Sequence, residues 1–373
     1  MIYFDNAATT PLTPSVITAM TEIMKNSFGN PSSLHTFGRQ ANQYLRAFRS
    51  AIARHLETSE RNIIFTSGGT ESNNTAIIGY ALANQDKGKH LITTSIEHHS
   101  VLHAMAYLEE RFGFEVTYLL PKNGSISAQQ VKAALRPDTI LVSVMHANNE
   151  TGSLNDIPEI GNVLADHQAV FHVDAVQTVG KIAVLPENWG IDFLSASAHK
   201  FHGPKGVGFL YAKTKRFDNL LHGGDQEDKR RASTENMISL AGMAAALSEA
   251  SENLETNYQH IQKLRQAFLR ELNGLDYYIN AGQETMPHVL NIGFPGANNG
   301  LLLTQLDLAG FAVSTGSACT AGAVTPSHVL TSYYGEKSPK LDESIRISFG
   351  DQNSIQEAQL LAQTLKKLLS KGN

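Results

Sequence analysis

Asp174 and Lys200 are two charged residues whose type and position together suggest chemistry. Asp174 directly follows an apolar run at 169–173, and Lys200 closely follows another at 193–196, so both should lie at the ends of buried strands. A buried carboxylate is unfavourable unless it is paired, so Asp174 either caps the next helix or faces a cationic ring nitrogen. A lysine that forms a Schiff base must be partly desolvated, so that its neutral amine is accessible. The pair makes pyridoxal 5'-phosphate the leading candidate cofactor.

The stretch Ser-Gly-Gly-Thr at 67–70 precedes a predicted helix. It could be a plain turn with a helix cap. It could also be a phosphate cradle, in which glycines let the backbone approach and free N–H groups at the helix start bind the anion. The Walker A spacing is absent both here and in "GPKGVG" at 203–208, which we interpret as a turn into a strand.

His98 and His99 follow another predicted strand, and His99 and His103 have the i, i+4 spacing of possible zinc ligands. The His-Glu-x-x-His arrangement is missing, however, and a third ligand is not obvious. A histidine that stacks on a flat cofactor ring and moves protons fits this position better, so we predict no metal site.

Cys319 is the only cysteine among 373 residues, and it stands in "STGSACTAGAVTPSH" at 314–328. A single cysteine excludes an internal disulfide. A buried cysteine often behaves as a small apolar side chain. The neighbouring glycines, Gly316 and Gly322, indicate a loop instead, and taken alone the residues leave both interpretations open.

Apolar runs that predict strands alternate with helical patterns through much of the chain, which is typical of an α/β fold. We expect strands at 62–66, 90–94, 115–119, 139–145, 169–173, 193–196 and 206–211. We expect helices between them at 73–83, 100–111 and 158–166. Polar clusters follow five of the strands, at 66–74, 95–100, 146–152, 174–180 and 197–206. Because ligands bind at the carboxyl ends of strands in open α/β sheets, these clusters predict one ligand site.

The pattern changes at a long amphipathic segment at 251–273, which predicts a helix. Strands at 289–294 and 345–349 and a closing helix at 355–369 follow. We therefore predict a large, mostly parallel α/β domain at 14–250. A smaller α+β domain is predicted from 1–13 and 251–373.

The composition is that of a globular protein with a sizeable core, since 42% of residues are hydrophobic and 17% are charged. The formal net charge of -5 and the lack of long charge runs argue against direct binding to nucleic acid or a membrane surface. The N-terminus does not resemble a signal peptide, and no apolar run approaches the length of a membrane span. We expect a cytoplasmic enzyme or binding protein.

A series of motifs in this chain resembles the NifS/IscS-type cysteine desulfurases, which are class V aminotransferase-like pyridoxal phosphate enzymes of fold type I. The motifs are "YFDNAATTP" (3–11), "GNPSSLH" (29–35), "FTSGGTESNN" (65–74), "IEHHSVL" (96–102), "MHANNETG" (145–152), "HVDAVQT" (172–178), "SAHKFHGPKGVGFLY" (197–211) and "TGSACTAGAVTPSHVL" (315–330). They occur in the family's order over nearly the whole chain. The resemblance implies the fold-type I architecture, a large sheet domain with a smaller α+β domain.

The resemblance also implies a role for each matching residue. Lys200 would bind the cofactor as a Schiff base and then act as acid and base at the substrate Cα, while His98 would stack on the ring and move protons. Asp174 would pair with the ring nitrogen. Further cofactor contacts would come from Gln177 and Asn149 near the ring hydroxyl, from Gly69, Thr70, Ser197 and His199 at the phosphate, and from Thr234 of the other subunit of a homodimer. The substrate carboxylate would be bound by Arg346, with Asn149 and Asn30 in the same pocket.

For Cys319 the resemblance implies attack of its thiolate on the sulfur of L-cysteine, which leaves alanine and a persulfide on Cys319. The loop that carries it should move between the cofactor and a sulfur acceptor, and we expect a mobile loop at about 320–335. The acceptor would be an iron–sulfur scaffold or a tRNA-thiolating enzyme. The chain departs from the family at Asp225 and Ser233, where many members have glycine, and its "RRASTEN" at 230–236 resembles a subgroup that supplies sulfur for thiolated tRNA.

Other functions remain open at this point. A cysteine or selenocysteine lyase, or an aminotransferase, would share the fold but would not need Cys319. A cofactor-binding scaffold without turnover and a zinc hydrolase using His98, His99 and His103 are more distant alternatives.

Overall fold

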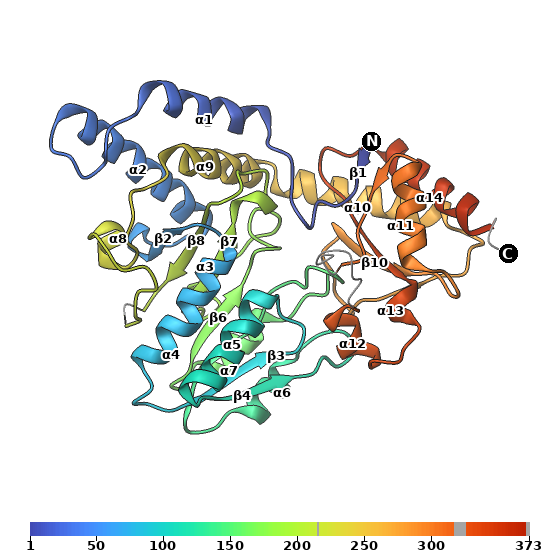
Figure 1. Ribbon diagram of the computed structural model, residues 1–373, viewed down its shortest axis with the longest axis horizontal. Helices are drawn as coiled ribbons and strands as arrows, with labels where there is room; N and C mark the ends of the chain where they lie inside the picture. Colours follow the sequence, from blue (N-terminus) through green and yellow to red (C-terminus); the bar gives the residue numbers. More distant parts are fainter. Residues whose placement is uncertain (215, 317–325, 371–373) are drawn as a thin grey trace.

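The computed structural model describes residues 1–214, 216–316 and 326–370. A seven-stranded sheet lies at the centre of the larger part of the molecule, in the order β2-β8-β7-β6-β5-β3-β4 (Figure 1). Of these strands β8 alone runs antiparallel to its neighbours, and the other pairs are parallel. The strands are β2 (Ile63–Thr66), β3 (His90–Thr94), β4 (Glu115–Leu119), β5 (Thr139–Ser143), β6 (Val170–Asp174), β7 (Phe193–Ser197) and β8 (Gly208–Ala212). The predicted α/β class and all seven strands are confirmed.

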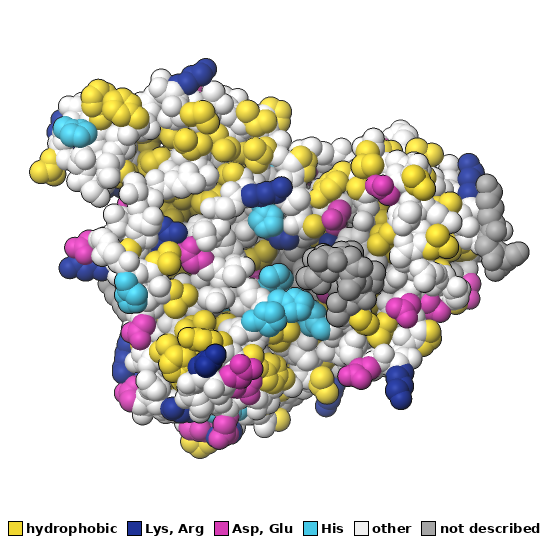
Figure 2. All heavy atoms as spheres, viewed as in Figure 1, with side chains coloured by type: hydrophobic (Ala, Val, Ile, Leu, Met, Phe, Trp, Pro, Cys, Tyr) yellow, Lys and Arg dark blue, Asp and Glu magenta, His cyan; other side chains and the backbone are white. Residues whose placement is uncertain are grey.

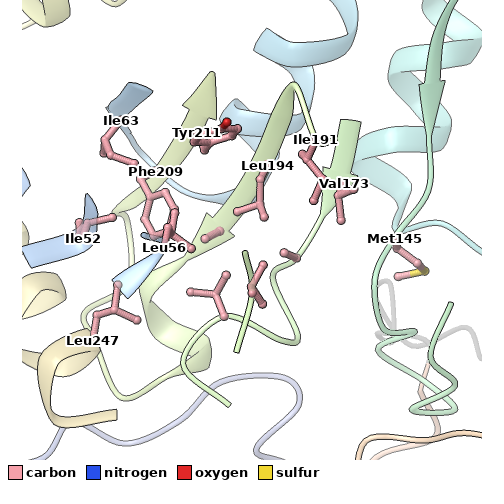
Figure 3. Close-up of a cluster of buried hydrophobic side chains, with 14 of the residues drawn as sticks. Ile52, Leu56, Ile63, Met145, Val173, Ile191, Leu194, Phe209, Tyr211 and Leu247 are labelled. Carbon is pink, nitrogen blue, oxygen red and sulfur yellow. The ribbon is translucent and has the colours of Figure 1, made fainter. Parts of the chain in front are cut away.

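Hydrophobic clusters cover both faces of this sheet, because successive side chains of a strand point to opposite faces. In β8, Phe209 and Tyr211 belong to one cluster and Leu210 to the other. Figure 3 shows the first cluster, where Leu56 and Leu247 lie near Phe209. The helices that contribute to it are α1 (Pro14–Asn26), α2 (Thr36–His55), α6 (Ala128–Ala134), α7 (Ile157–Leu164), α9 (Met237–Glu252) and, through Val329, α12 (His328–Tyr334). The opposite face is covered by α5 (His99–Phe112) and by the helical run at 69–83.

The helical run at 69–83 is not a uniform α-helix. It begins as α3 (Gly69–Asn74), continues as a π-helical turn (Thr75–Gly79) and ends as α4 (Tyr80–Ala83). The sequence pattern predicted that this helix begins at 73. The structure starts it at 69, so that the glycine stretch itself forms the N-terminus of the helix.

The smaller part of the molecule contains a three-stranded antiparallel sheet in the order β12-β10-β9 and a short parallel pair, β1 with β11. The elements are β1 (Ile2–Tyr3), β9 (Tyr278–Ile279), β10 (Val289–Gly293), β11 (Phe311–Ala312), β12 (Ser344–Ser348), α10 (Leu254–Glu271), α11 (Asn299–Leu308), α12 (His328–Tyr334), α13 (Lys340–Glu343) and α14 (Ile355–Ser370). Helix α12 lies in the stretch predicted to be a mobile loop at about 320–335, so the prediction of a loop is wrong for 328–334, while 320–325 lie outside the described residues.

A separate hydrophobic cluster fills this smaller part, and Phe4 from the N-terminus packs in it with Phe268 and Phe349. We therefore still propose the predicted division into 14–250 on one side and 1–13 with 251–373 on the other. A short helix, α8 (Gln226–Lys229), and two 3-10 turns, at Glu60–Asn62 and Ala198–Lys200, complete the described elements.

Candidate active site

The polar clusters predicted at the strand ends do meet at one edge of the large sheet. Although β2 pairs with the antiparallel strand β8, β2 itself runs in the same direction as β7, so their carboxyl ends point the same way. Asp174 is the last residue of β6, and Ser197 is the last residue of β7. His98 is the N-cap of α5.

Lys200 ends the 3-10 turn that follows β7, and its ammonium is enclosed by the N-terminal segment. Its Nζ donates to the carbonyl oxygens of Ala7 at 2.6 Å and Ala8 at 2.8 Å. Burial, and after it the nearby Arg346 cation, lower the pKa of Lys200 to about 8, against the opposing effects of Asp174 and Asp5. A neutral amine is therefore accessible near neutral pH, as a Schiff-base lysine requires.

Asp174 is 5% exposed, and each of its carboxylate oxygens accepts a hydrogen bond. The backbone N–H of Val176 donates to Oδ1 at 3.0 Å, and the side-chain amide of Asn73 donates to Oδ2 at 2.8 Å. This anion is held at the sheet edge next to His98 and Lys200, whose pKa values it raises. It is suitably placed to face a cationic ring nitrogen.

The residues proposed for the cofactor phosphate lie around the start of α3. Gly68 has a φ of 149°, which other residues rarely adopt, and a Cβ added to Gly69 would lie 2.8 Å from the side chain of Val176, so both positions favour glycine. Thr70 follows in the first turn of the helix. His199 contributes a buried Nδ1 that has no partner among the described residues. Free helix N–H groups, a hydroxyl and an imidazole without a partner fit a phosphate group.

Gln177 is held by two hydrogen bonds at the same edge. Its Nε2 donates to the carbonyl of Ala7 at 3.0 Å, and its Oε1 is paired with Nε2 of His288 at 3.2 Å. Burial keeps the pKa of His288 well below its ordinary value, so the ring is neutral and donates to Gln177. The amide of Gln177 thereby has a fixed orientation, with one N–H still available for a ring hydroxyl.

Arg346 lies in β12 and is 4% exposed. Its Nη2 pairs with Asp5 at 2.8 Å and its Nη1 donates to the carbonyl of Asn149 at 3.0 Å. Its Nε is buried with no partner in the described structure. A guanidinium with a free donor beside Asn149 fits a substrate carboxylate.

Cys319 lies outside the described residues, but the residues on both sides of its segment contact this site. Ser314 forms two backbone hydrogen bonds with Arg346. On the other side, Ser327 donates to the buried carboxyl of Glu150, next to Asn149. A Cβ on Gly316 would lie 2.9 Å from the same Glu150 oxygen. The two described ends of the segment therefore meet beside the substrate-binding candidates.

Two of the predicted site residues, Asn30 and Thr234, do not lie at the candidate active site of their own chain. Asn30 lies in the exposed loop between α1 and α2, where its Oδ1 accepts from the backbone of Ser32 at 2.9 Å, and Figure 1 shows this loop at the far end of the molecule from β10. Thr234 is exposed and lines a surface hollow with Ser67 and Arg231. The preceding Ser233 has a φ of 101°, a left-handed conformation that glycine adopts more readily.

Two hollows flank the candidate site. An open cleft of about 1050 Å³ is lined by Thr70, His98 and His103, and Figure 2 shows histidine side chains gathered on this face. A second cavity of about 300 Å³ reaches Lys200 from the other side and includes Lys181. His98 therefore has accessible surface, but desolvation by the enclosing protein lowers the pKa of its imidazole.

Within the part of the chain that the structure describes, no group of three or more histidine, cysteine or acidic side chains could hold a metal ion. The rings of His99 and His103 lie 5.2 Å apart, and His328 approaches His99 at 4.6 Å, but these imidazoles pack against one another. Within the same ranges, no helix has the length and apolar character needed to cross a membrane.

Sequence reasoning missed several residues of this site. Lys181 donates to the carbonyl of Lys200 at 2.7 Å, and burial lowers its pKa to about 7. Asn73, Ser100 and His288 hold the side chains of predicted site residues. Asn73 and Ser100 belong to the motifs at 65–74 and 96–102, so their place in these motifs was a possible signal. The residues that they contact, however, lie far away in the sequence.

The fold and the site can now be compared with those of known protein families. The sequence profile of the aminotransferase class-V family matches residues 2–361, nearly the whole chain. A solved structure described as a NifS-like protein superposes with a TM-score of 0.92 at 34% identity and covers 99% of both chains. Another, described as SspA in complex with cysteine, has a TM-score of 0.84 at 36% identity, with 95% of this chain and 100% of that chain covered. These are pyridoxal phosphate-dependent enzymes.

Curated relatives narrow the class further. A putative cysteine desulfurase IscS 1 of Bacillus subtilis (strain 168) is 49% identical over 366 residues, which covers 97% of this chain and 96% of the relative. A cysteine desulfurase IscS of Dictyoglomus turgidum is 45% identical over 335 residues, with 88% and 85% covered. The chain belongs to the family of NifS/IscS-type cysteine desulfurases.

Proposed function

We propose that this chain converts L-cysteine to L-alanine and holds the released sulfur as a persulfide on Cys319, from which an acceptor takes it. The observation that carries this proposal is the position of both ends of the Cys319 segment beside Arg346 and Glu150. A lyase would not need a cysteine in this segment.

Each residue of the site has a proposed role in this reaction. Bound pyridoxal 5'-phosphate supplies an electron sink for the substrate Cα. Lys200 would hold it through Nζ, and the amine of Lys200, whose pKa is lowered, would take the Cα proton of the substrate. Arg346 binds the substrate carboxylate, and Asp174 offers an anion to the ring nitrogen.

The remaining residues hold the cofactor and move protons. His98, which lines the open cleft, would lie against the cofactor and exchange protons with the substrate. Gly69, Thr70, Ser197 and His199 would hold the phosphate. Gln177 and Asn149 would contact the ring hydroxyl.

The sulfur step is a displacement at the substrate sulfur. A bond forms between Sγ of Cys319 and that sulfur while the Cβ–S bond breaks, and the electron pair returns to the carbon skeleton. The carbon takes up protons and leaves as alanine. The sulfur stays on Cys319 as a persulfide until an acceptor or an added thiol reductant removes it.

The test is alanine formation from L-cysteine, with a thiol reductant present, by the wild type and by Cys319→Ala. We expect alanine from the wild type and almost none from the variant, which should still bind the cofactor and show its visible absorbance. Lys200→Ala is the control that should lose both. Equal alanine from wild type and Cys319→Ala would remove Cys319 from the reaction, and pyruvate in place of alanine would make the chain a lyase.

A homodimer is part of the proposal, since Thr234 is expected to reach the phosphate of the other subunit. An exposed apolar surface on α1, α2 and their connection supports association, and Figure 2 shows its hydrophobic side chains at the upper left. Its residues include Ile17, Met24, Phe28, Leu34 and Phe37, of which Phe28 is 80% and Leu34 is 89% exposed. An exposed apolar patch of this kind marks an interaction surface.

Sedimentation analysis tests the dimer. The wild type should sediment as a dimer, and the double variant Phe28→Asp/Phe37→Asp as a monomer. Leu120→Asp is the matched control, because Leu120 is 62% exposed and lies outside this surface. A monomeric wild type would contradict the proposal.

The acceptor is proposed to be an iron–sulfur scaffold or a tRNA-thiolating enzyme, in a cytoplasmic setting. Transfer of ³⁵S from labelled cysteine to each purified candidate protein distinguishes the two. Label that stays on Cys319 with both candidates would exclude both.

A further inference from the structure

A chain of hydrogen bonds connects Asp174 to His98 through two side chains that have no assigned role. The amide of Asn73 donates to Oδ2 of Asp174 and also to Oγ of Ser100, both at 2.8 Å. Oγ of Ser100 lies 2.8 Å from Nδ1 of His98. The chain joins α3, α5 and the end of β6, and it connects two residues that the proposed function places against the cofactor.

The donors in this chain can be assigned from chemistry. An ionised carboxylate only accepts, so the atom of Asn73 that faces Asp174 is its NH₂ group, and both of its hydrogens are used. Ser100 Oγ accepts one of them, which leaves the hydroxyl hydrogen of Ser100 free for Nδ1 of His98. The backbone N–H of Ser100 also donates to Nδ1, at 3.1 Å. Nδ1 of His98 thus receives two donors and has no room for a proton of its own.

We propose that Asn73 is a positioning residue which, through Ser100, holds Nδ1 of His98 as a hydrogen-bond acceptor and so keeps the proton of the neutral ring on Nε2. This inference rests on the proposed function of His98 as the residue that covers the cofactor and exchanges protons. With Nδ1 fixed, Nε2–H is the group that His98 offers to the cofactor and substrate.

The side chain of Asn73 is buried where it makes these hydrogen bonds. It is 1% exposed, and its Oδ1 is buried without a partner in the described structure. A buried polar atom without a partner costs free energy, which the two hydrogen bonds of the amide to Asp174 and Ser100 offset. Asn73 also lies two residues before the π-helical turn at Thr75–Gly79, and such turns are frequent at functional sites.

Burial and most of the charges around His98 favour its neutral ring. Desolvation lowers the pKa of His98, and the nearby Lys200, His99 and His328 lower it further, while Asp174 raises it. The neutral ring is therefore favoured, and the only question that remains is which nitrogen carries the proton.

Nuclear magnetic resonance of the full chain, loaded with pyridoxal 5'-phosphate and labelled with ¹⁵N at histidine, answers this question. The signals of His98 are identified as those that disappear in His98→Asn. In the wild type we expect the pattern of an Nε2–H tautomer that does not change between about pH 6.5 and 8.5. In Asn73→Ala we expect a mixture of tautomers or a proton uptake within this range.

Asn84→Ala is the matched control. Asn84 is also fully buried, donates its amide to two backbone carbonyls, of Tyr80 and Arg216, and has no partner for its Oδ1 among the described residues. It directly follows the same helical run, and both of these carbonyls lie outside the candidate site. We expect Asn84→Ala to lower the melting temperature while the signals of His98 and the turnover stay at wild-type values.

Turnover gives a second readout. Loss of a hydrogen bond to a charged group predicts that Asn73→Ala lowers kcat for alanine formation roughly tenfold or more. Because Asn73 and Ser100 act in one chain, the double variant with Ser100→Ala should lose little more than the worse single variant. Ser100→Ala keeps the backbone N–H that donates to Nδ1 of His98 in the N-cap of α5. This variant therefore tests the same series of hydrogen bonds if Asn73→Ala does not fold.

Two results would overturn the inference: unchanged His98 signals in Asn73→Ala, or additive losses in the double variant. If the wild type forms no alanine from cysteine, the proposed function fails, but the tautomer of His98 is still read directly from the resonance experiment. The two failures are therefore distinguishable.

Discussion

The lowered pKa of Lys200 makes a quantitative prediction about how fast the cofactor-free protein takes up pyridoxal 5'-phosphate. Only the neutral amine attacks the aldehyde, so the second-order rate should follow the neutral fraction of Lys200. With a pKa of about 8, that fraction rises from about one tenth at pH 7 to about nine tenths at pH 9. The rate should therefore rise about tenfold over this interval and level off above it.

An ordinary lysine would behave differently. With an unperturbed pKa of about 10.4, the neutral fraction would rise roughly 100-fold between pH 7 and pH 9 and would not level off there. The measurement is stopped-flow absorbance in the visible range after mixing cofactor-free protein with excess pyridoxal 5'-phosphate. Working above pH 7 keeps the phosphate of the added cofactor ionised. A rise of about 100-fold without a plateau would refute the argument from burial.

Two variants separate the effect of nearby charges on the pKa of Lys200 from the effect of burial. Arg346 lowers the pKa of Lys200, so Arg346→Met should move the midpoint to higher pH, and the loss also leaves Asp5 without its partner. Asp5→Asn should move the midpoint to lower pH, since it removes an anion and leaves Arg346 unpaired. Shifts in the same direction for both variants would contradict the assignment of these charges.

Three further outcomes are expected. Arg346→Lys should raise KM for L-cysteine roughly tenfold or more with a smaller change in kcat, measured as alanine formation, because a lysine cannot form the planar two-point contact. Arg49 contacts both oxygens of the buried Glu227 at 2.7 Å, so Arg49→Met should lower the free energy of unfolding by about 3 kcal/mol in a denaturant titration, and the double variant with Glu227→Leu should regain part of it. Burial lowers the pKa of His172 to about 3, so the unfolded chain binds one more proton between about pH 3 and 6.5 and stability falls as the pH falls through this range. His172→Gln should reduce that slope by about 1.4 kcal/mol per pH unit, and an unchanged slope would mean that His172 already titrates normally in the folded chain.

The sheet and the edge that carries the site could be predicted from the sequence because the physical signal is local. Apolar runs of buried strands end in polar clusters, and parallel strands bring those ends together without further information. Helix α9 (Met237–Glu252) shows where this fails. It packs against both α1 and α2 and is buried through most of its length, including Leu240, Met243 and Leu247. A helix buried on several sides has no amphipathic stripe, so the pattern that found α10 was absent.

The contacts that tune the site could not be predicted for a different reason. Lys200 is held by Ala7 and Ala8, and Asp174 by Asn73, over long separations in the chain. Every residue has a backbone carbonyl, so the sequence does not indicate that those of Ala7 and Ala8 bind Lys200. The pairing of Asn73 with Asp174 depends on a helix that begins four residues earlier than its periodicity suggested. Such contacts follow from packing, which no local pattern encodes.

The N-terminal segment shows how the two parts of the molecule are made to act together. Asp5 pairs with Arg346 in the small sheet, while the carbonyl of Ala7 accepts hydrogen bonds from both Lys200 and Gln177 at the edge of the large sheet. The backbone N–H of Ala7 in turn donates to Oγ of Ser348 at 2.9 Å. A displacement of this short segment would therefore disturb the proposed cofactor lysine and the proposed substrate arginine at once. The motif at 3–11 therefore connects Lys200 at the edge of the large sheet with Arg346 in the small sheet. It contacts both residues although it lies far from them in the sequence.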